Sequence, residues 1–376
     1  MKPKIFLIIP SLNKGGAERV ISLLSNTLDE RGYEIILVLL NYTRNSYKLN
    51  KNVRIVYLNM RGPATGLFNR IYSATRRFFK LMSLVDKEKP KLIISFITSA
   101  NMWGSIAGNL FNIPYIVSER SNPDKTIGRL TTLMQKFIFI LYRKANAVVL
   151  PSRGMLSGLK NVNFRQLTNV VSITNPLTEF KAFSEKKVHP RQFVLAVGRL
   201  NWVKGYDRLI DAYSQVETDR DLLIVGEGPE RVRLQKQING LGIGHKVFLA
   251  GAKDNIHDYY KQSDLFVLSS HYEGFPNVLI EAMSAGCPVI AVDCHFGPAE
   301  IIRNEENGLL IPNDDTLMLA AAIDRLLKDD RLRTRMAVNA RSVLKTNSID
   351  SVVDRWEELI ASATDTSSAV VEGTNH

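Results

Sequence analysis

Two glutamates lie close together where the sequence pattern changes from strand to helix. Residues 270–292 read SHYEGFPNVLIEAMSAGCPVIAV, with seven residues between Glu273 and Glu281. The preceding DLFVLSS is typical of a buried strand, and the apolar residues that follow predict a helix that begins near Pro276. A helix N-terminus offers unpaired N–H groups and a partial positive charge, which suits an anion such as phosphate. The residues expected to hold this anion are Gly274, Phe275, Pro276 and Asn277.

The two glutamates are placed to bind hydroxyl groups of the same ligand. Glu273 would flank the anion as a hydroxyl acceptor, whereas Glu281, roughly one turn into the helix, suits a vicinal diol such as a ribose. Either glutamate alone would be better explained as a capping or solvated carboxylate, but their occurrence together and with the neighbouring loops reverses this weighting. Phosphate, sugar and ribose together describe a nucleotide-sugar.

Two further loops supply groups for a diphosphate. Arg199 and Lys204 follow the strand FVLAVG within GRLNWVKGYDRLI, and two cations at that place suit a pyrophosphate, although alone they would be read as solvated loop charges. The next strand ends in GEGPER, where Gly226 and Gly228 permit a tight turn. This G-x-G lacks the third glycine of a dinucleotide fingerprint, and the chain contains neither GKS nor GKT. NAD enzymes and P-loop ATPases are therefore disfavoured.

The N-terminal stretch PSLNKGGAERV has a similar layout. Gly15 and Gly16 follow a strand and open a helix, so Gly16 would let this loop approach the donor phosphate. A plain turn before a helix explains the two glycines equally well.

These loops require parallel sheets to position them. Short β-branched runs alternate with amphipathic stretches along most of the chain, which is the pattern of βαβ units, and ligands of such sheets bind beyond the carboxyl ends of the strands. The alternation pauses at residues 178–190 and then restarts. We therefore expect an α/β protein with two doubly wound, Rossmann-like domains, an N-terminal one over residues 1–185 and a C-terminal one over 186–348. A helix at 349–362 could pack on either domain, and a flexible tail would occupy 363–376.

Charge divides the chain unevenly. Residues 1–188 hold 29 Lys and Arg against 10 Asp and Glu, a net of +19, whereas residues 189–376 hold 20 against 27, a net of −7. The basic half is expected to face something anionic.

Cys287 and Cys294 show no disulfide or zinc spacing and are interpreted as core thiols of a reduced compartment. Without a signal-peptide pattern or a membrane-length apolar run, a cytoplasmic location is expected.

These motifs together resemble the retaining GT-B glycosyltransferases of family 4. The resemblance covers nearly the whole chain, and it rests on the E-x7-E pattern of Glu273 and Glu281, on GRL, on KG and on the N-terminal GGAE. It implies two Rossmann-like domains that face a central cleft, with the acceptor bound by the N-terminal domain and the donor by the C-terminal one. It also implies that Arg199 and Lys204 hold the donor pyrophosphate, that Glu273 touches the donor sugar and that Glu281 binds the ribose.

Two stretches of the chain, the D-x-D match and SERSNP, need comparison with the pattern of the family. The family works without a metal, so no cofactor is expected, and the D-x-D match at Asp219–Asp221 precedes a strand and is interpreted as a solvated turn. Many relatives have a histidine where this chain has SERSNP. Arg120 stands in its place, where it would orient the acceptor or the leaving phosphate, and Glu119 would bind an acceptor hydroxyl.

The basic half contains a candidate acceptor surface. In GLFNRIYSATRRFFKLMSLVDKEK, Leu67, Ile71, Tyr72, Phe78, Phe79, Met82 and Val85 are predicted to share one helical face, opposite Arg70, Arg76, Arg77, Lys80 and Lys87. Such a helix can simply pack on its sheet, lie against anionic lipid, or bind a lipid-linked pyrophosphate. We assign Arg70, Arg77 and Lys80 to acceptor binding. A second cluster, LMQKFIFILYRKA, has the same character.

The favoured interpretation is a peripheral enzyme at the inner face of the plasma membrane. It would move a hexose or N-acetylhexosamine from a UDP-sugar, with UDP-N-acetylgalactosamine as the suggested donor, to a polyprenyl-diphosphate-linked saccharide in surface glycan assembly. One alternative is a GT-B epimerase or phosphorylase that needs no lipid acceptor. Another is a basic nucleic-acid-binding protein, although no motif of a known nucleic-acid-binding module is found.

Overall fold

The computed structural model describes residues 2–13, 15–43, 45–60, 66–162, 164–177, 184 and 186–372, without the side chains of residues 67, 70 and 366–372. The chain divides into two compact units, one formed by Met1–Pro176 with Ile349–His376 and the other by Leu177–Ser348. The sequence pattern placed the division between residues 185 and 186.

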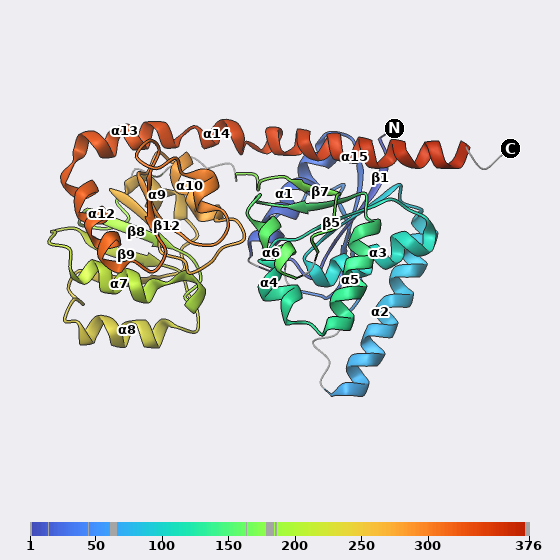
Figure 1. The fold of residues 1–376 in the computed structure, drawn as a ribbon, viewed down its shortest axis with the longest axis horizontal. Coiled ribbons are helices and arrows are strands. Elements are labelled where there is room, and N and C mark those ends of the chain that lie inside the picture. The colour runs from blue at the N-terminus through green and yellow to red at the C-terminus, as the bar shows by residue number, and fades with distance from the viewer. Residues whose placement is uncertain are drawn as a thin grey trace. The chain divides into compact units, whose positions relative to one another are not determined.

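The first unit is built on a parallel sheet. Within the described residues it has seven strands in the order β3-β2-β1-β4-β5-β6-β7 (Figure 1). The strands are β1 (Lys4–Ile9), β2 (Glu34–Leu39), β3 (Arg54–Tyr57), β4 (Leu92–Phe96), β5 (Tyr115–Ser118), β6 (Ala147–Leu150) and β7 (Val170–Ser172). The helices are α1 (Gly16–Glu30), α2 (Leu67–Glu88), α3 (Thr98–Phe111), α4 (Pro123–Thr126), α5 (Thr132–Lys144), α6 (Met155–Asn161) and α15 (Ile349–Glu372), with a 3-10 turn η1 (Ile127–Arg129).

The second unit repeats this plan. Its described residues form six parallel strands in the order β10-β9-β8-β11-β12-β13. They are β8 (Phe193–Val197), β9 (Asp221–Val225), β10 (Val247–Gly251), β11 (Leu265–Leu268), β12 (Val289–Asp293) and β13 (Leu309–Pro312). The helices are α7 (Tyr206–Ser214), α8 (Arg231–Gly240), α9 (Ile256–Gln262), α10 (Asn277–Ser284), α11 (Pro298–Ile301), α12 (Thr316–Lys328), α13 (Asp330–Ala340) and α14 (Val343–Thr346), with a 3-10 turn η2 (Trp202–Lys204). The predicted α/β class with two Rossmann-like units is confirmed.

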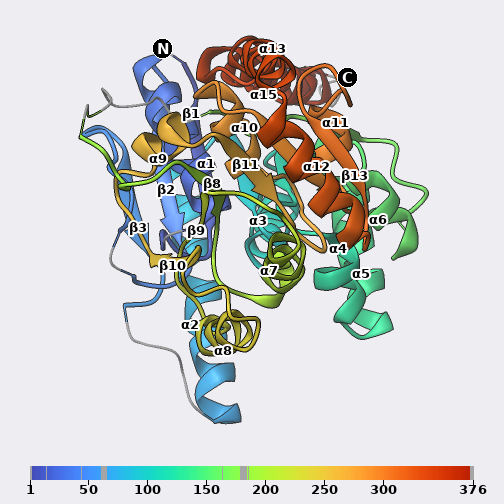
Figure 2. The same cartoon turned by 90° about the vertical axis from the view of Figure 1, so that its left-hand side faces the viewer.

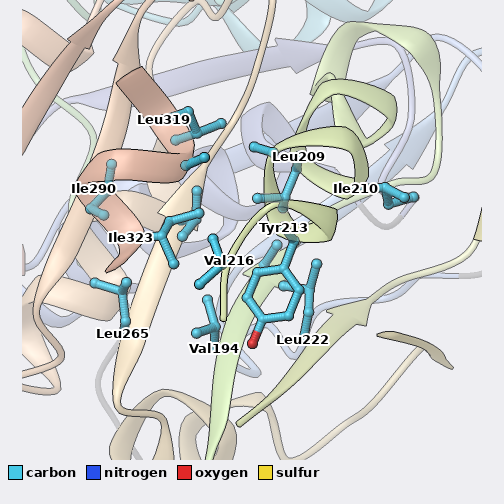
Figure 3. Packing of buried hydrophobic residues seen from close by; sticks show 14 of the residues in the cluster. Val194, Leu209, Ile210, Tyr213, Val216, Leu222, Leu265, Ile290, Leu319 and Ile323 are labelled. Carbon is cyan, nitrogen blue, oxygen red and sulfur yellow. The ribbon is translucent and has the colours of Figure 1, made fainter. Parts of the chain in front are cut away.

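Helices cover both faces of each sheet, which explains why the strands are nearly continuous apolar runs. On one face of the second sheet, α7 and α12 pack side by side over Val194 and Ile290 (Figures 2 and 3). On the other face, Leu279 of α10 and Tyr260 of α9 join a separate cluster. Cys287, in this second cluster, and Cys294 are both free and buried. Burial raises the pKa of each thiol to about 12, so both are unreactive core thiols, as predicted.

The C-terminal helix α15 is part of the first unit. Its buried Val352, Trp356 and Ile360 join the cluster that includes Ile5 of β1, and the helix lies beside α1 (Figure 1). Arg31, just past α1, adds ion pairs to α15. Its guanidinium lies 3.0 Å from Asp350, 2.5 Å from Asp354 and 2.5 Å from Glu357.

The length of α15 differs from the prediction. The helix continues to Glu372, so its end is not at residue 362, and residues 363–372 are not a separate tail. The apolar spacing that packs the helix on its sheet reaches Ala363, which is 3% exposed. The serine- and threonine-rich residues beyond it carry no proline or glycine before Gly373 that would stop the helix.

Packing of α15 can be tested with a matched pair of substitutions. Ile360→Ala removes a side chain that is 1% exposed and should lower the free energy of unfolding by about 2–5 kcal/mol. Glu358→Ala, on the exposed face of the same helix, should change it by no more than about 0.5 kcal/mol. Urea unfolding followed by tryptophan fluorescence measures both, and equal stabilities for the two variants would contradict the packing.

Candidate active site

The predicted donor loops meet at the place where the strand order of the second sheet reverses. From β8 the chain goes outward to β9 and β10, whereas β11 begins the opposite direction with β12 and β13. Open α/β sheets bind ligands at such a point, beyond the carboxyl ends of the two central strands. The loop after β8 carries Arg199 and Lys204, and the loop after β11 carries Glu273.

A charge pair joins these two loops. The Lys204 Nζ lies 2.6 Å from Glu273 Oε1, and the Ser270 hydroxyl donates to the same oxygen at 2.6 Å. Both partners are largely buried, with 19% of the lysine side chain and 10% of the glutamate side chain exposed. Arg199, by contrast, has an exposed side chain in the same loop. Of the three residues predicted to act on the diphosphate and sugar of the donor, Lys204 and Glu273 are thus in direct contact, and Arg199 lies nearby in the chain.

Glycines allow the loops to come together. Gly205 has φ +59°, and a Cβ there would lie 2.1 Å from the Ser269 carbonyl oxygen. A Cβ on Gly226, at φ +150°, would lie 1.9 Å from the Gly198 carbonyl oxygen. Backbone hydrogen bonds also join these loops to the ends of the next strands: the Gly198 N–H donates to the Val225 carbonyl of β9 and the Gly226 N–H to the Gly251 carbonyl of β10, each at 3.0 Å. Gly226 therefore permits close backbone approach.

The helix predicted near Pro276 is confirmed as α10, whose N-cap is Pro276. The Phe275 side chain is 8% exposed and packs in the core, so only the backbone of Phe275 can face a ligand. The Asn277 N–H donates to the Phe275 carbonyl at 3.0 Å. The positive end of the α10 dipole is directed at the loop that holds Gly274 and Glu273.

Glu281 lies inside α10 and is 4% exposed. The Tyr260 hydroxyl of α9 donates to its Oε2 at 3.0 Å, which fixes the carboxylate. The two glutamates of the E-x7-E pattern are thus held by different partners, Glu273 by a lysine and a serine and Glu281 by a tyrosine.

Sequence reasoning missed Arg208, which positions the Glu273 loop. This buried side chain of α7 donates through Nε to the Ser269 carbonyl at 2.6 Å and through Nη2 to the Ser270 carbonyl. Its Nη1 contacts Asp314 at 3.1 Å. The sequence did contain a signal for this role. Arg208 stands at a position of α7 that the apolar pattern predicts to be packed, and a charged side chain at such a position needs partners inside the protein. Trp202 was missed as well; it is 55% exposed and stacks on His271 at 4.5 Å.

Of the two aspartates of the D-x-D match, one is exposed and the other is buried. Asp219 has an 85% exposed side chain. Asp221 opens β9, is fully buried and pairs with Arg191 at 2.7 Å and His189 at 2.6 Å. The interpretation of Asp221 as solvated is therefore wrong, because a carboxylate at the start of a buried strand needs such partners.

In the first unit, Gly16 begins α1 directly after the N-cap Gly15. The Tyr47 hydroxyl accepts from the Gly15 N–H at 3.0 Å and donates to the Gly15 carbonyl at 2.7 Å, which fixes this turn. Gly16 and the donor loops of the second unit thus belong to different units of the chain.

Glu119 is a buried network residue and not an exposed hydroxyl acceptor. It follows β5, is 1% exposed and accepts hydrogen bonds from Thr98 at 2.9 Å, from Asn101 at 3.1 Å and from the Tyr142 hydroxyl. Both carboxylate oxygens are therefore occupied inside the protein, which contradicts its assignment to acceptor binding. Beside it, Ile97 has φ +76°, a strained conformation for a β-branched residue.

The orientation of α2 also differs from the prediction. Leu81 and Val85 are the buried residues, whereas Phe68, Ile71, Tyr72 and Phe79 are more than half exposed. Arg77 is half-buried and donates to Asn41, and Lys80 donates to the Tyr57 carbonyl, so both are turned toward the strands. Of the predicted polar face, Arg76, Lys80 and Lys87 are exposed and Arg77 is half-buried. The predicted apolar face packs only in part, with Val85 buried and Ile71, Tyr72 and Phe79 exposed. The Arg70 side chain lies outside the described residues.

The Glu119 network predicts a pH-dependent stability. Burial, opposed by the hydrogen bonds and by Arg120, raises the pKa of Glu119 to about 7. Between about pH 4.5 and 7 the unfolded chain releases a proton that the folded chain retains, so stability from this group falls as pH rises through that range.

Glu119→Gln replaces the carboxyl group by an amide of nearly the same size, so the side chain can no longer bind or release a proton. The stability of the wild type relative to this variant should fall by roughly 3 kcal/mol between about pH 4.5 and about pH 8. Urea unfolding across the range measures this difference, and parallel pH profiles for the two proteins would contradict the raised pKa.

Comparison with known proteins identifies the family. Residues 14–176 match the family described as Glycosyltransferase Family 4, and residues 178–343 match the family described as Glycosyl transferases group 1. A similar protein of Campylobacter jejuni is named GalNAc-alpha-(1->4)-GalNAc-alpha-(1->3)-diNAcBac-PP-undecaprenol alpha-1,4-N-acetyl-D-galactosaminyltransferase. It is 27% identical and the match covers 95% of this chain and 98% of the relative.

A second relative and a solved structure agree. The N-acetylgalactosamine-N,N'-diacetylbacillosaminyl-diphospho-undecaprenol 4-alpha-N-acetylgalactosaminyltransferase of Campylobacter jejuni is 28% identical, over 91% of this chain and 95% of the relative. The crystal structure of Anabaena HepE in complex with UDP superposes with a TM-score of 0.78 at 20% identity, covering 96% of this chain and 100% of HepE. The chain belongs to glycosyltransferase family 4, has the GT-B fold and is a glycosyltransferase.

Proposed function

We propose that the protein transfers a hexose or N-acetylhexosamine from a UDP-sugar to a lipid-diphosphate-linked saccharide, with retention of the anomeric configuration. The observation that carries the proposal is the Lys204–Glu273 pair between the loops after β8 and β11, next to the N-terminus of α10. A cation, a carboxylate and a helix dipole at one point suit a diphosphate joined to a sugar.

In the proposed reaction the protein acts mainly through fixed charge. Lys204, Arg199 and the positive end of α10 stabilise the charge that grows on the departing diphosphate. Lys204 exchanges its contact with Glu273 for the phosphate, and Glu273 then accepts from a hydroxyl of the donor sugar. Glu281 binds the ribose. The departing phosphate takes the proton from the acceptor hydroxyl on the same face, so no metal and no further base is required of the protein.

The identities of donor and acceptor rest on similar proteins. Both Campylobacter relatives are named as N-acetylgalactosaminyltransferases, and their names describe saccharides linked through a diphosphate to undecaprenol. Another relative, from Erwinia amylovora, is named an amylovoran biosynthesis glycosyltransferase. HepE structures contain UDP and UDP-glucose. We extend these properties to this chain, with UDP-N-acetylgalactosamine as donor and a polyprenyl-diphosphate saccharide as acceptor.

An acceptor of this kind requires contact with a membrane. None of the described helices is both long enough and apolar enough to cross a bilayer. A peripheral contact is supported by the exposed apolar residues of α2, Phe68, Ile71, Tyr72 and Phe79, and by the exposed Arg76 of the same helix. The N-terminal half of α2 extends past α3 and α5 (Figure 1). Helix α5 also exposes apolar residues, Leu133, Phe137 and Ile140. We propose that these helices rest on an anionic lipid surface at the inner face of the plasma membrane.

Transfer itself is tested with a panel of UDP- and GDP-sugars and lipid-diphosphate saccharides. The protein should use UDP-N-acetylgalactosamine and form an α-linkage. Product analysis by mass spectrometry and NMR identifies donor and linkage, and a product of inverted configuration, or turnover without any lipid-linked acceptor, would contradict the proposal.

Lys204→Ala should lower kcat by about 10²–10³-fold, because it removes one preorganised charge from the diphosphate site. The matched control is Lys328→Ala, a lysine of α12 whose side chain is 67% exposed, which should leave turnover unchanged. Steady-state assays on both variants, with circular dichroism to verify folding, provide the measurement. Wild-type turnover in the Lys204 variant would refute its role.

Membrane contact is tested by vesicle flotation. The variant Arg76→Gln loses one exposed cation, worth about 1 kcal/mol at an anionic surface, so binding should fall roughly fivefold. A control, Arg331→Gln/Val338→Ser on α13, alters exposed residues of the second unit and should float like the wild type. Equal flotation of all three proteins would argue against the α2 surface.

A further inference from the structure

Arg120 has an unusual set of neighbours for a guanidinium. It follows Glu119 at the carboxyl end of β5, and its Cζ lies 4.6 Å from the centroid of the Phe96 ring and 5.9 Å from that of Trp356. The two rings are stacked on each other, with centroids 5.8 Å apart and an interplanar angle of 28°. Two aromatic side chains therefore set the position of this cation.

Its hydrogen bonds are incomplete. Nη1 donates to Asn175 Oδ1 at 2.6 Å, but Nε and Nη2 are inaccessible to solvent and have no hydrogen-bond partner. Buried N–H groups are nearly always paired in folded proteins, so two unpaired ones on a single side chain indicate a missing partner. A planar guanidinium with two adjacent free donors matches the geometry of two oxygens of a phosphate.

The neighbouring carboxylate does not fill this role. The Glu119 carboxylate accepts hydrogen bonds from Thr98, Asn101 and Tyr142, and within the part of the chain that the structure describes no carboxylate forms an ion pair with Arg120. Burial lowers the pKa of Arg120 to about 9, and the charge of Glu119 opposes this shift, so the side chain is still cationic near neutral pH. Arg120 is thus a cation that the charge of Glu119 influences but that forms no direct ion pair within the described residues.

Trp356 comes from the C-terminal helix, far from Arg120 in sequence. The helix is fixed on the first unit by its buried apolar face and by the three carboxylates that contact Arg31. Because the Trp356 side chain is 1% exposed, its ring is held in a single place. The position of the guanidinium therefore depends on a residue that follows the second unit in the chain.

We propose that Trp356 is a positioning residue that, together with Phe96, holds Arg120 ready to bind a phosphate oxyanion, the diphosphate of the lipid-linked acceptor. The proposal rests on the function proposed above. The acceptor is favoured over the nucleotide because Arg120 lies in the strongly basic first unit, whereas Lys204 and Arg199 of the second unit are the cations assigned to the donor.

Kinetics of three variants test the positioning role. Trp356→Leu should raise the KM for the acceptor about tenfold, with little change in the KM for the donor, because it removes the ring but keeps an apolar side chain. Trp356→Phe retains a ring face and should stay close to the wild type. Ile360→Ala weakens the same helix without touching Arg120 and should leave both KM values unchanged, which separates positioning from stability.

A double-mutant cycle adds a readout that a merely structural role would not move. Arg120→Gln should raise the acceptor KM, and Trp356→Leu should have no further effect in that background, because both changes remove the same interaction. Additive effects, a wild-type acceptor KM in Trp356→Leu, or an increase in the donor KM instead, would each overturn the proposal.

A binding measurement does not depend on turnover. The chain has three tryptophans, so Trp103→Phe/Trp202→Phe leaves Trp356 as the sole reporter. Inorganic pyrophosphate should change its fluorescence in a saturable way, and Arg120→Gln should abolish the change. If no sugar is transferred but pyrophosphate still acts through Arg120, the proposed function fails and the oxyanion site stands. If sugar is transferred and pyrophosphate has no effect, the inference fails and the function stands.

Discussion

The close approach of the loops after β8 and β11 is the constraint on which the donor site depends. Lys204 reaches Glu273 at 2.6 Å only because the backbone beside it passes against the Ser269 carbonyl, where a Cβ on Gly205 would lie at 2.1 Å. Arg208 of α7 fixes the loop after β11 by donating hydrogen bonds to the Ser269 and Ser270 carbonyls. Gly205 in the loop after β8 and the buried Arg208, which binds the loop after β11, thus bring Lys204 and Glu273 together.

The two units use their charge differently. In the second unit, Lys204 is fixed by Glu273 and Arg208 by the Ser269 and Ser270 carbonyls, whereas Arg199 has an exposed side chain. The first unit carries the excess of basic residues, yet Arg77 and Lys80 are turned toward Asn41 and the Tyr57 carbonyl. What it presents outward on α2 is a mixture of Arg76 with exposed aromatic residues, a composition that suits the interface of a membrane better than a polyanion in water.

Particular residues show how far the sequence could be read. Alternating β-branched runs predicted most of the strands, and the E-x7-E stretch predicted the strand, loop and helix around Glu273, because such patterns report local structure. Periodicity could not say how much of the apolar face of α2 would be buried, since that depends on the neighbouring α3. The three-residue strand β7 is too short for a clear pattern. Asp221 and Glu119 were taken as exposed because a carboxylate usually is, and only the fold reveals their buried partners.

The central claim is that the diphosphate of the donor binds where the loops after β8 and β11 meet. A crystal structure of the protein with UDP-N-acetylgalactosamine tests it most directly. The account predicts that Lys204 leaves Glu273 to contact the diphosphate together with Arg199, that the phosphate faces the N-terminus of α10, and that the ribose hydroxyls reach Glu281. A nucleotide bound elsewhere, with the Lys204–Glu273 pair intact, would contradict it.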